Sequence, residues 1–229
     1  MTAFTGFSEE TVAFYRQLAI CNERFWFEAH KAEFKQQVMT PAQAFVAAMG
    51  ERLTSIAPHL IYDNRATGSG SIYRIHRDTR FSPDKTPYKT FLGILFWEGS
   101  RHKNECSGFY LQLNPDNIYL AVGIYIFPSA LLKTYRDAVV HPELGARLTT
   151  VVRDIAAASY QVGGTHYKRV PAGYDATHQN AALLKHNGLY AGIEMPIPDA
   201  LYSETFVEFC FAHFQAMLPL HQWLLRTLA

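Results

Sequence analysis

Three runs of strand-forming residues, joined by short turn signals, constrain the fold of this chain more than any other feature. They span residues 88–97, 107–114 and 118–127, and the sequence Asn-Pro-Asp-Asn at 114–117 is a strong turn signal. Strands joined by tight turns pair antiparallel, because a parallel pair needs a long crossover connection. The last two runs are apolar at nearly every position, so we expect helices on at least one face. The pattern predicts an α+β fold: a mainly antiparallel sheet built from hairpins, covered by N-terminal and C-terminal helices.

Helical patterns precede these strands. Ser8 is a good N-cap, followed by two glutamates that favour the positive end of the helix dipole, and a second helix should begin after Asn22. The sequence Thr-Pro-Ala-Gln at 40–43 predicts a third helix, which opens with a capping box and carries proline at its first position.

Further helices are expected after the hairpins. Two follow one another, the second beginning at Pro142. The pair of glycines at 163–164 is expected to break the chain before a last strand at 189–197. A long helix should then begin at Asp199, and Pro219 should kink or divide it.

The composition indicates one globular domain over residues 1–229. Of the 229 residues, 48% are hydrophobic and only 18% are charged, which suits a sizeable core and argues against a disordered tail. The three cysteines lie too far apart for a ligand pair or a disulfide framework, which predicts a cytoplasmic protein. The chain shows no leader and no run of about 18 apolar residues, so we expect no membrane partner.

The sharpest chemical signal is a positively charged segment over residues 73–90, which we call the basic hairpin. It holds five basic residues against two acidic ones, a local net charge of +3, in a chain whose net charge is +1. As a strand, residues 72–81 would point Ile72, Arg74, His76, Asp78 and Arg80 to one face. The other set is mostly apolar and would point to the core: Tyr73, Ile75, Arg77, Thr79 and Phe81. The turn at 82–87 contains two prolines, which predicts a hairpin with a rigid, charged loop.

Two interpretations of the basic hairpin stay open. In the first, Asp78 and Asp84 pair with neighbouring arginines on a solvated surface, where such pairs contribute about 0–1 kcal/mol. In the second, the arginines hold an anion, because the planar guanidinium binds phosphate or carboxylate through two hydrogen bonds at once. We favour the second, since a solvated face needs neither the alternation nor the two prolines.

A second basic segment lies in the loop over residues 166–175. It contains Lys168, Arg169, Tyr174 and Asp175, in a stretch bounded by proline and glycine of the kind that often carries functional residues. If this loop folds onto the basic hairpin, the site gains two cations and a potential base, Asp175. The alternative is an ordinary solvated loop.

Three segments of the sequence resemble one known family. They are residues 71–90, which run from Ser-Ile-Tyr-Arg to Tyr-Lys-Thr; residues 22–31, Asn-Glu-Arg-Phe-Trp-Phe-Glu-Ala-His-Lys; and residues 168–175, Lys-Arg-Val-Pro-Ala-Gly-Tyr-Asp. Taken in chain order, with His178 and Leu183-Leu184-Lys185 following the last of them, they resemble the bacterial and fungal family catalogued as domain of unknown function 2461, along nearly the whole chain. The family has no established activity, so the resemblance implies a single compact α+β domain and no mechanism.

No motif in the sequence names a reaction. It contains no phosphate-binding glycine-rich loop, no dinucleotide fingerprint and no nucleophile elbow. The ten histidines lack the spacing of a zinc site, so we expect no metal, and any cofactor is unknown.

Three functions stay open. The first is binding or turnover of a small anionic ligand, phosphorylated or carboxylated, at the basic hairpin. The second is a nucleic-acid-binding module that uses the same basic face. The third is a protein-interaction domain in which the arginines form structural ion-pair networks and the C-terminal helix meets a partner or a second copy in a homodimer. We rank the first highest.

The first hypothesis assigns roles to twelve residues. Asp78 and Asp175 are the candidate catalytic acids or bases. The candidate ligand-binding residues are Arg74, Arg77, Arg80, Asp84, Lys85, Tyr88, Lys89, Lys168, Arg169 and Tyr174.

Overall fold

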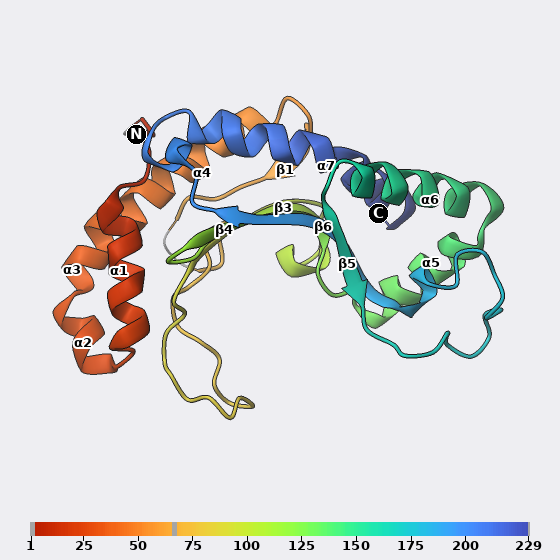
Figure 1. Cartoon of the computed structure of the whole chain (residues 1–229), viewed down its shortest axis with the longest axis horizontal. Helices are drawn as coiled ribbons and strands as arrows, with labels where there is room; N and C mark the ends of the chain where they lie inside the picture. Colours follow the sequence, from red (N-terminus) through yellow and green to blue (C-terminus); the bar gives the residue numbers. More distant parts are fainter. Residues whose placement is uncertain (1–2, 66–67, 229) are drawn as a thin grey trace. The chain divides into compact units, whose positions relative to one another are not determined.

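The computed structural model describes residues 3–65 and 68–228 (Figure 1). The α-helices are α1 (Glu9–Ile20), α2 (Arg24–Ala29), α3 (Lys31–Glu33), α4 (Thr40–Leu53), α5 (Ser129–Val140), α6 (Pro142–Ala157) and α7 (Phe206–Leu228). The strands are β1 (Leu60–Ile61), β2 (Leu92–Glu98), β3 (Ser107–Leu113), β4 (Asn117–Ile124), β5 (Gln161–Thr165) and β6 (His186–Pro196). They form a six-stranded antiparallel sheet in the order β1-β2-β3-β4-β6-β5, which confirms the α+β prediction.

The chain divides into two compact units. The first unit comprises Met1–Phe96, Tyr110–Leu120 and Glu194–Ala212. The second unit comprises Trp97–Phe109, Ala121–Ile193 and His213–Ala229. The organisation of residues 1–229 as one domain stays a prediction.

Helical structure runs without a break from α3 into α4, so the predicted capping box at Thr40 is wrong. A π-helix, Phe34–Met39, joins the two helices, and Thr40 already has helical backbone angles. Pro41 has no N–H to donate to the carbonyl of Gln37 four residues earlier. The hydroxyl of Thr11 on α1 donates to that carbonyl instead, over 2.6 Å. The wider π turn and a side chain from another helix together accommodate the proline.

The core of the first unit forms where an N-terminal and a C-terminal helix meet a strand. Phe45 of α4 is fully buried, and its ring centroid lies 5.5 Å from that of Phe206 on α7. It also lies 6.4 Å from the ring of Phe96 on β2. Burying aromatic side chains of this size contributes a large share of folding free energy.

The core of the second unit is also aromatic. The rings of Phe109 on β3 and Phe214 on α7 lie 5.5 Å apart, edge to face. Trp223 packs against Tyr135 of α5 at 6.3 Å, and its indole N–H donates to the carbonyl of Leu144 on α6 over 3.0 Å. The indole of a buried tryptophan is therefore satisfied, and α5, α6 and α7 are tied together.

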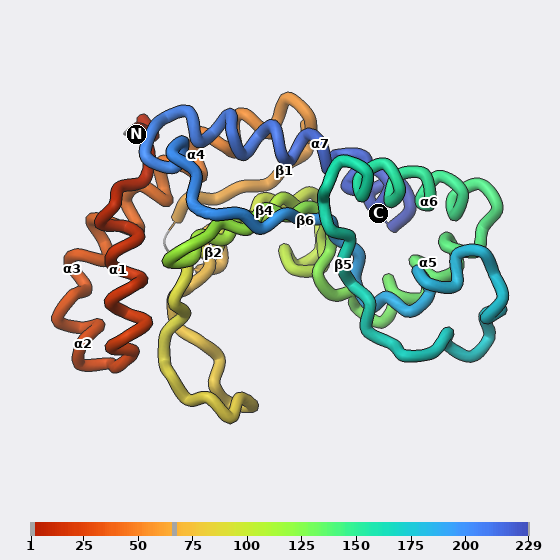
Figure 2. Tube along the Cα trace, viewed as in Figure 1, coloured from red at the N-terminus to blue at the C-terminus, as the bar shows by residue number. Residues whose placement is uncertain are grey.

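The predicted hairpin between the second and third strand runs is confirmed. The backbone N–H of Asn114 donates to the carbonyl of Asn117 over 2.9 Å, which closes the turn between β3 and β4. The predicted break at 163–164 is wrong, because these glycines lie inside β5, which pairs with β6 (Figure 2). A side chain at Gly164 would put Cβ 2.0 Å from the carbonyl oxygen of Gly188, so the close approach of the strands requires glycine.

Pro219 does not divide the C-terminal helix, and a kink at this residue stays a prediction. α7 is continuous over Phe206–Leu228 with Pro219 inside it. The neighbouring Met217 and Leu220 are fully buried, so apolar packing on both sides of the proline offsets the lost backbone hydrogen bond. None of the helices in the described part of the chain has both the length and the apolar character that crossing a bilayer requires.

The Thr11–Gln37 hydrogen bond generates a stability prediction. Thr11→Val keeps the side-chain volume but removes the Thr11 donor to the Gln37 carbonyl, which Pro41 cannot replace. We expect a loss of about 1–3 kcal/mol in the free energy of unfolding, measured by urea denaturation.

Pro41→Ala restores a backbone N–H, so the cost of Thr11→Val should fall by about half or more in that background. Thr134→Val is the matched control: its exposed hydroxyl donates to the carbonyl of Ala130 on the surface of α5, and the change should stay within about 0.5 kcal/mol. If Thr11→Val lowers the free energy of unfolding equally with Pro41 and with Pro41→Ala, the Thr11 hydroxyl does not replace the missing N–H of Pro41.

Candidate functional site

The basic hairpin is extended, but it is not the regular strand that its sequence predicts. Among the described residues, the segment 72–81 pairs with the rest of the chain at two isolated bridges, Ile72 with Ile94 and His76 with Tyr88. The ladder is interrupted because the segment leaves the sheet and carries its charged tip beyond it (Figure 1). Its backbone is therefore fixed in part by side chains rather than by strand pairing alone.

The predicted alternation is confirmed for four of the five residues placed on the polar face and is wrong for Ile72, which is buried. Arg74, His76, Asp78 and Arg80 are all exposed, whereas Ile75 on the opposite face is buried. The prediction fails at the end of the apolar face, where Phe81 is 94% exposed. The alternating pattern predicts that Phe81 points into the core, but the core does not extend as far as the hairpin tip.

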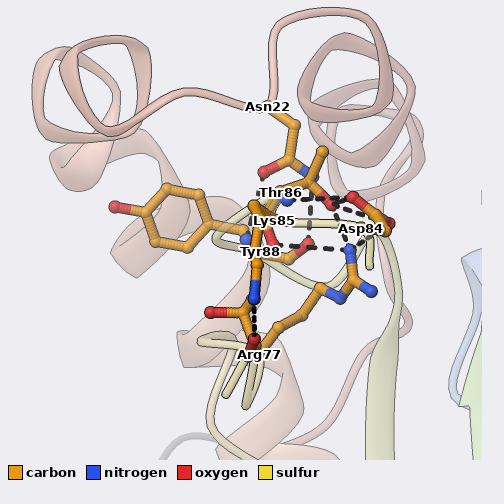
Figure 3. A network of polar contacts seen from close by, with 7 residues as sticks. Asn22, Arg77, Asp84, Lys85, Thr86 and Tyr88 are labelled. Atoms are coloured by element: carbon orange, nitrogen blue, oxygen red, sulfur yellow. Dashed lines mark hydrogen bonds and ion pairs between the residues drawn. The ribbon is translucent and has the colours of Figure 1, made fainter. Parts of the chain in front are cut away.

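The tip is held by a network around Asp84 (Figure 3). The guanidinium of Arg77 donates to the carboxylate of Asp84 and to the hydroxyl of Thr86. The backbone N–H of Thr86 donates to the other carboxylate oxygen of Asp84 over 2.9 Å. The Thr86 amide and the Arg77 guanidinium together lower the pKa of Asp84 to about 2. Lys85 donates to the carbonyl of Thr79 over 2.8 Å, which closes the loop.

Arg80, the next arginine in the hairpin, forms a second ion pair. Arg80 donates through Nε and Nη2 to the two carboxylate oxygens of Asp78, over 2.9 Å and 2.6 Å. These hydrogen bonds lower the pKa of Asp78 to about 2. A carboxylate with so low a pKa is a weak proton acceptor near neutral pH, so this geometry suits an ion pair better than acid–base catalysis.

The helical segment at the N-terminus anchors the return strand of the hairpin. The side-chain amide of Asn22 donates to the carbonyl of Tyr88 over 2.9 Å, and its oxygen accepts from the Tyr88 N–H over 3.1 Å (Figure 3). The ring of Tyr88 is buried and stacks on Phe27 at 4.3 Å. Tyr88 therefore fixes the hairpin and does not present its ring to solvent.

Among the described residues, three of the five basic side chains of the hairpin form no ion pair: Lys85, whose ammonium donates to the Thr79 carbonyl, and Arg74 and Lys89. Lys89 is about half buried, and its ammonium lies 5.2 Å from the ring centroid of Tyr73 and 6.0 Å from that of Phe91. Burial, and next the nearby charge of Arg74, lower the pKa of Lys89 below its ordinary value.

Next to the Lys89 ammonium lies a group of three aromatic and polar side chains, Tyr73, Tyr110 and Gln112, which we call the tyrosine face. The rings of Tyr73 and Tyr110 lie 6.2 Å apart over Gly93, where a Cβ would stand 3.1 Å from the Tyr110 hydroxyl. That hydroxyl donates to the Gln112 side chain over 2.8 Å. Burial raises the pKa of Tyr73 to about 12 and also raises that of Tyr110, so both phenols stay protonated.

Sequence reasoning missed the tyrosine face. The signal was present in β3, where Tyr110 and Gln112 alternate with the fully buried Phe109, Leu111 and Leu113. Such alternation marks a sheet with one face packed on the core and one face open.

The second basic segment belongs to the second unit, whereas the basic hairpin belongs to the first. The Tyr174 hydroxyl donates to Asp137 of α5 over 2.8 Å, and Asp175 accepts from the backbone N–H of Thr177 over 2.8 Å. Lys168 and Arg169 are exposed. The joining of this loop to the basic hairpin stays a prediction.

Sequence reasoning also missed Arg136 of α5, which adds a cation to the second unit. Its guanidinium lies 4.9 Å from the ring centroid of Tyr167, at the start of the basic loop. Its Nε and Nη2 atoms are buried and have no hydrogen-bond acceptor among the described residues. In those same residues, no group of three or more His, Cys, Asp or Glu side chains is arranged to hold a metal ion.

Comparison with known proteins identifies the family. The profile of the family described as conserved hypothetical protein (DUF2461) matches residues 10–223. The chain belongs to this family, as the three sequence segments predict. No curated protein matches the chain.

The Asn22 contacts predict a local stability change. Asn22→Ala removes two hydrogen bonds to the Tyr88 backbone, so we expect the hairpin to open more easily by about 1–3 kcal/mol. Hydrogen exchange of the Tyr88 amide measures this change. Glu23→Ala is the control, since the exposed Glu23 makes no side-chain capping bond; an equal acceleration in both variants would contradict the anchoring role.

The two low carboxyl pKa values predict an acid transition in the hairpin. Because the folded-state values lie below the ordinary value of about 4, the ion pairs stabilise the hairpin above about pH 4. That contribution is lost as the pH falls to about 2. Carboxyl carbon NMR titration should give midpoints of about 2 for Asp78 and Asp84.

Each arginine provides the control for the other. Arg80→Ala should raise the Asp78 midpoint towards about 4 and leave Asp84 unchanged. Arg77→Ala should raise the Asp84 midpoint by less, because the Thr86 amide remains its largest stabilising contact. Midpoints that do not respond to either substitution would refute the pairing.

Proposed function

We propose that this protein binds a small anionic ligand, phosphorylated or carboxylated, through Arg74 and Lys89 at the base of the basic hairpin. One observation carries the proposal. The acidic residues of the hairpin form ion pairs with Arg77 and Arg80, whereas Arg74 and Lys89 form no ion pair among the described residues and lie close enough to repel each other.

The electrostatics favour an anion at this position. A half-buried ammonium that interacts with a neighbouring guanidinium is destabilised in its charged form, as the lowered pKa of Lys89 indicates. A phosphate or carboxylate between the two groups would remove the repulsion and accept charge-assisted hydrogen bonds from both. Arg74 is exposed, so its planar guanidinium is accessible to a ligand from solvent.

The tyrosine face supports a ligand larger than a bare ion. Tyr73 and Phe91 present aromatic rings beside the Lys89 ammonium, and Tyr110 and Gln112 add polar groups on the same unit. Apolar surface with a few convergent polar groups is typical of sites for small organic ligands. The uncharged part of the ligand would lie on these rings.

The proposal is for binding, with turnover as a further possibility at the same site. The two candidate acid–base groups are both engaged: Asp78 by Arg80, and Asp175 by Thr177. Turnover would require one of them to exchange its partner for a substrate.

A nucleic-acid-binding module is the alternative that one observation favours. Phe81 at the hairpin tip is almost fully exposed, and the Arg80 guanidinium lies 5.8 Å from its ring centroid. An exposed aromatic ring beside a cation can stack on a base and contact a phosphate. A steep fall in affinity with salt would distinguish this function from small-ligand binding.

Thermal stability in the presence of inorganic phosphate, phosphorylated metabolites and carboxylates tests the proposal. A ligand at about 100 times its dissociation constant should stabilise the wild type by about 2.7 kcal/mol. Arg74→Ala and Lys89→Met should each weaken binding about tenfold or more, because each removes a charge-assisted hydrogen bond.

Lys85→Met is the matched control. It removes a cation from the same hairpin, but one that is exposed and donates to the backbone of Thr79. Binding in Lys85→Met should stay within about twofold of the wild type. Equal losses in Lys85→Met and Lys89→Met would show that only overall charge matters, and no stabilisation by any anion of the panel would refute the proposed site.

A further inference from the structure

We infer that Ser107, His221 and Glu98 form a serine-hydrolase-type triad that opens into a cavity of the second unit and hydrolyses short-chain carboxylic esters. This site is separate from the proposed anion site: all three residues belong to the second unit, and Arg74 and Lys89 belong to the first. Either proposal can therefore fail without the other.

The three side chains form a continuous hydrogen-bonded chain. Ser107 begins β3, Glu98 ends β2 and His221 lies on α7. The Ser107 Oγ and His221 Nδ1 atoms are 2.8 Å apart, and His221 Nε2 lies 3.0 Å from Glu98 Oε2. The order nucleophile, imidazole, carboxylate is the one that activates a serine in acyl transfer.

The inferred reaction requires one tautomer of His221. In it, Nε2 carries the hydrogen and donates it to a carboxyl oxygen of Glu98. The lone pair of Nδ1 then accepts the hydroxyl proton of Ser107. Burial lowers the pKa of His221, which favours the neutral imidazole that a general base must be.

Two of the three residues lie on the wall of a cavity of about 230 Å³. Glu98 and Ser107 both line it, together with Arg101 and an apolar wall that includes Leu131, Leu224 and Leu228. The guanidinium of Arg101 is fixed by a hydrogen bond to the Leu228 carbonyl over 3.0 Å. This volume is below that of sites for drug-sized ligands, so it fits an ester with a short apolar acyl chain.

The reaction needs only water as co-reactant. The Ser107 Oγ attacks the ester carbonyl carbon while its proton moves to His221 Nδ1; the C–O bond to the alcohol then breaks, and the alcohol leaves with that proton. Water attacks the acyl-serine, gives a proton to His221, and the acid leaves as Ser107 recovers its hydrogen. Arg101 offers a positive charge on the cavity wall for the developing oxyanion.

A purely structural role explains this arrangement less well. Burying a serine, a histidine and a carboxylate costs desolvation free energy, and apolar residues of similar volume would pack a core at least as well. Moreover, a network that only stabilised the core would not need to line a cavity. Here two of its three members do.

Covalent labelling of the full chain with an alkyl fluorophosphonate tests the inference. This probe reacts with serines that are activated as nucleophiles. We expect a single adduct by intact-protein mass spectrometry, mapped to Ser107 by peptide sequencing, and absent in Ser107→Ala. We also expect hydrolysis of p-nitrophenyl acetate, with kcat lowered roughly 1,000-fold or more in Ser107→Ala.

Two further variants complete the experiment. Ser129→Ala removes an exposed serine of the same unit and should leave labelling and hydrolysis unchanged. Glu98 acts by positioning His221, so Glu98→Gln should lower kcat by at least about tenfold while KM stays within about twofold.

Labelling of Ser107 in the wild type supports the inference even if Ser107→Ala does not fold, because the peptide map identifies the reacting atom. Absence of labelling at Ser107, or ester hydrolysis that persists in a folded Ser107→Ala, overturns it.

Discussion

The burial of one face of the antiparallel sheet is the constraint on which the rest of this structure depends. In β3, Phe109, Leu111 and Leu113 are fully buried, and the residues between them are only partly covered. Because side chains alternate across a strand, this burial fixes the register of every polar residue on the other face. Tyr110 and Gln112 lie on the open face for this reason, and their placement follows from the packing of their neighbours.

The basic residues of the hairpin differ in whether a carboxylate neutralises them. Five basic residues are close in sequence, but two aspartates neutralise Arg77 and Arg80 and lock the tip. What remains at the base is the pair Arg74 and Lys89, where burial and like charge act together on Lys89. The aspartates thus bind the two arginines nearest the tip, where Lys85 is the remaining cation, and leave Arg74 and Lys89 beside the tyrosine face without an ion pair among the described residues.

In the second unit, three polar side chains are buried and hydrogen-bonded to one another rather than exposed as ion pairs. Glu98, Ser107 and His221 are largely removed from water, and each finds its partner in another of the three. Such a network is stable only when every member is satisfied, so the positions of β2, β3 and α7 must be fixed closely for it to exist. The aromatic contacts of Phe109, with Phe214 at 5.5 Å and with His221 at 4.7 Å, provide that packing.

The sequence alone determined the fold class, the β3–β4 hairpin, the starts of α1, α2 and α6 and the family, because these depend on local periodicity, turn residues and motifs. The predicted start of the C-terminal helix at Asp199 is wrong, since α7 begins at Phe206. The sequence also located the basic hairpin and the alternation of Arg74, His76, Asp78 and Arg80. Only the tertiary structure decided which cations stay unpaired, that Tyr88 is buried, and that the carbonyl left by Pro41 is satisfied by Thr11. It alone brought Glu98, Ser107 and His221 together across 123 positions of sequence. Contacts of this kind leave no periodic signal, since they join residues whose local patterns are independent, and packing rather than propensity sets their distances.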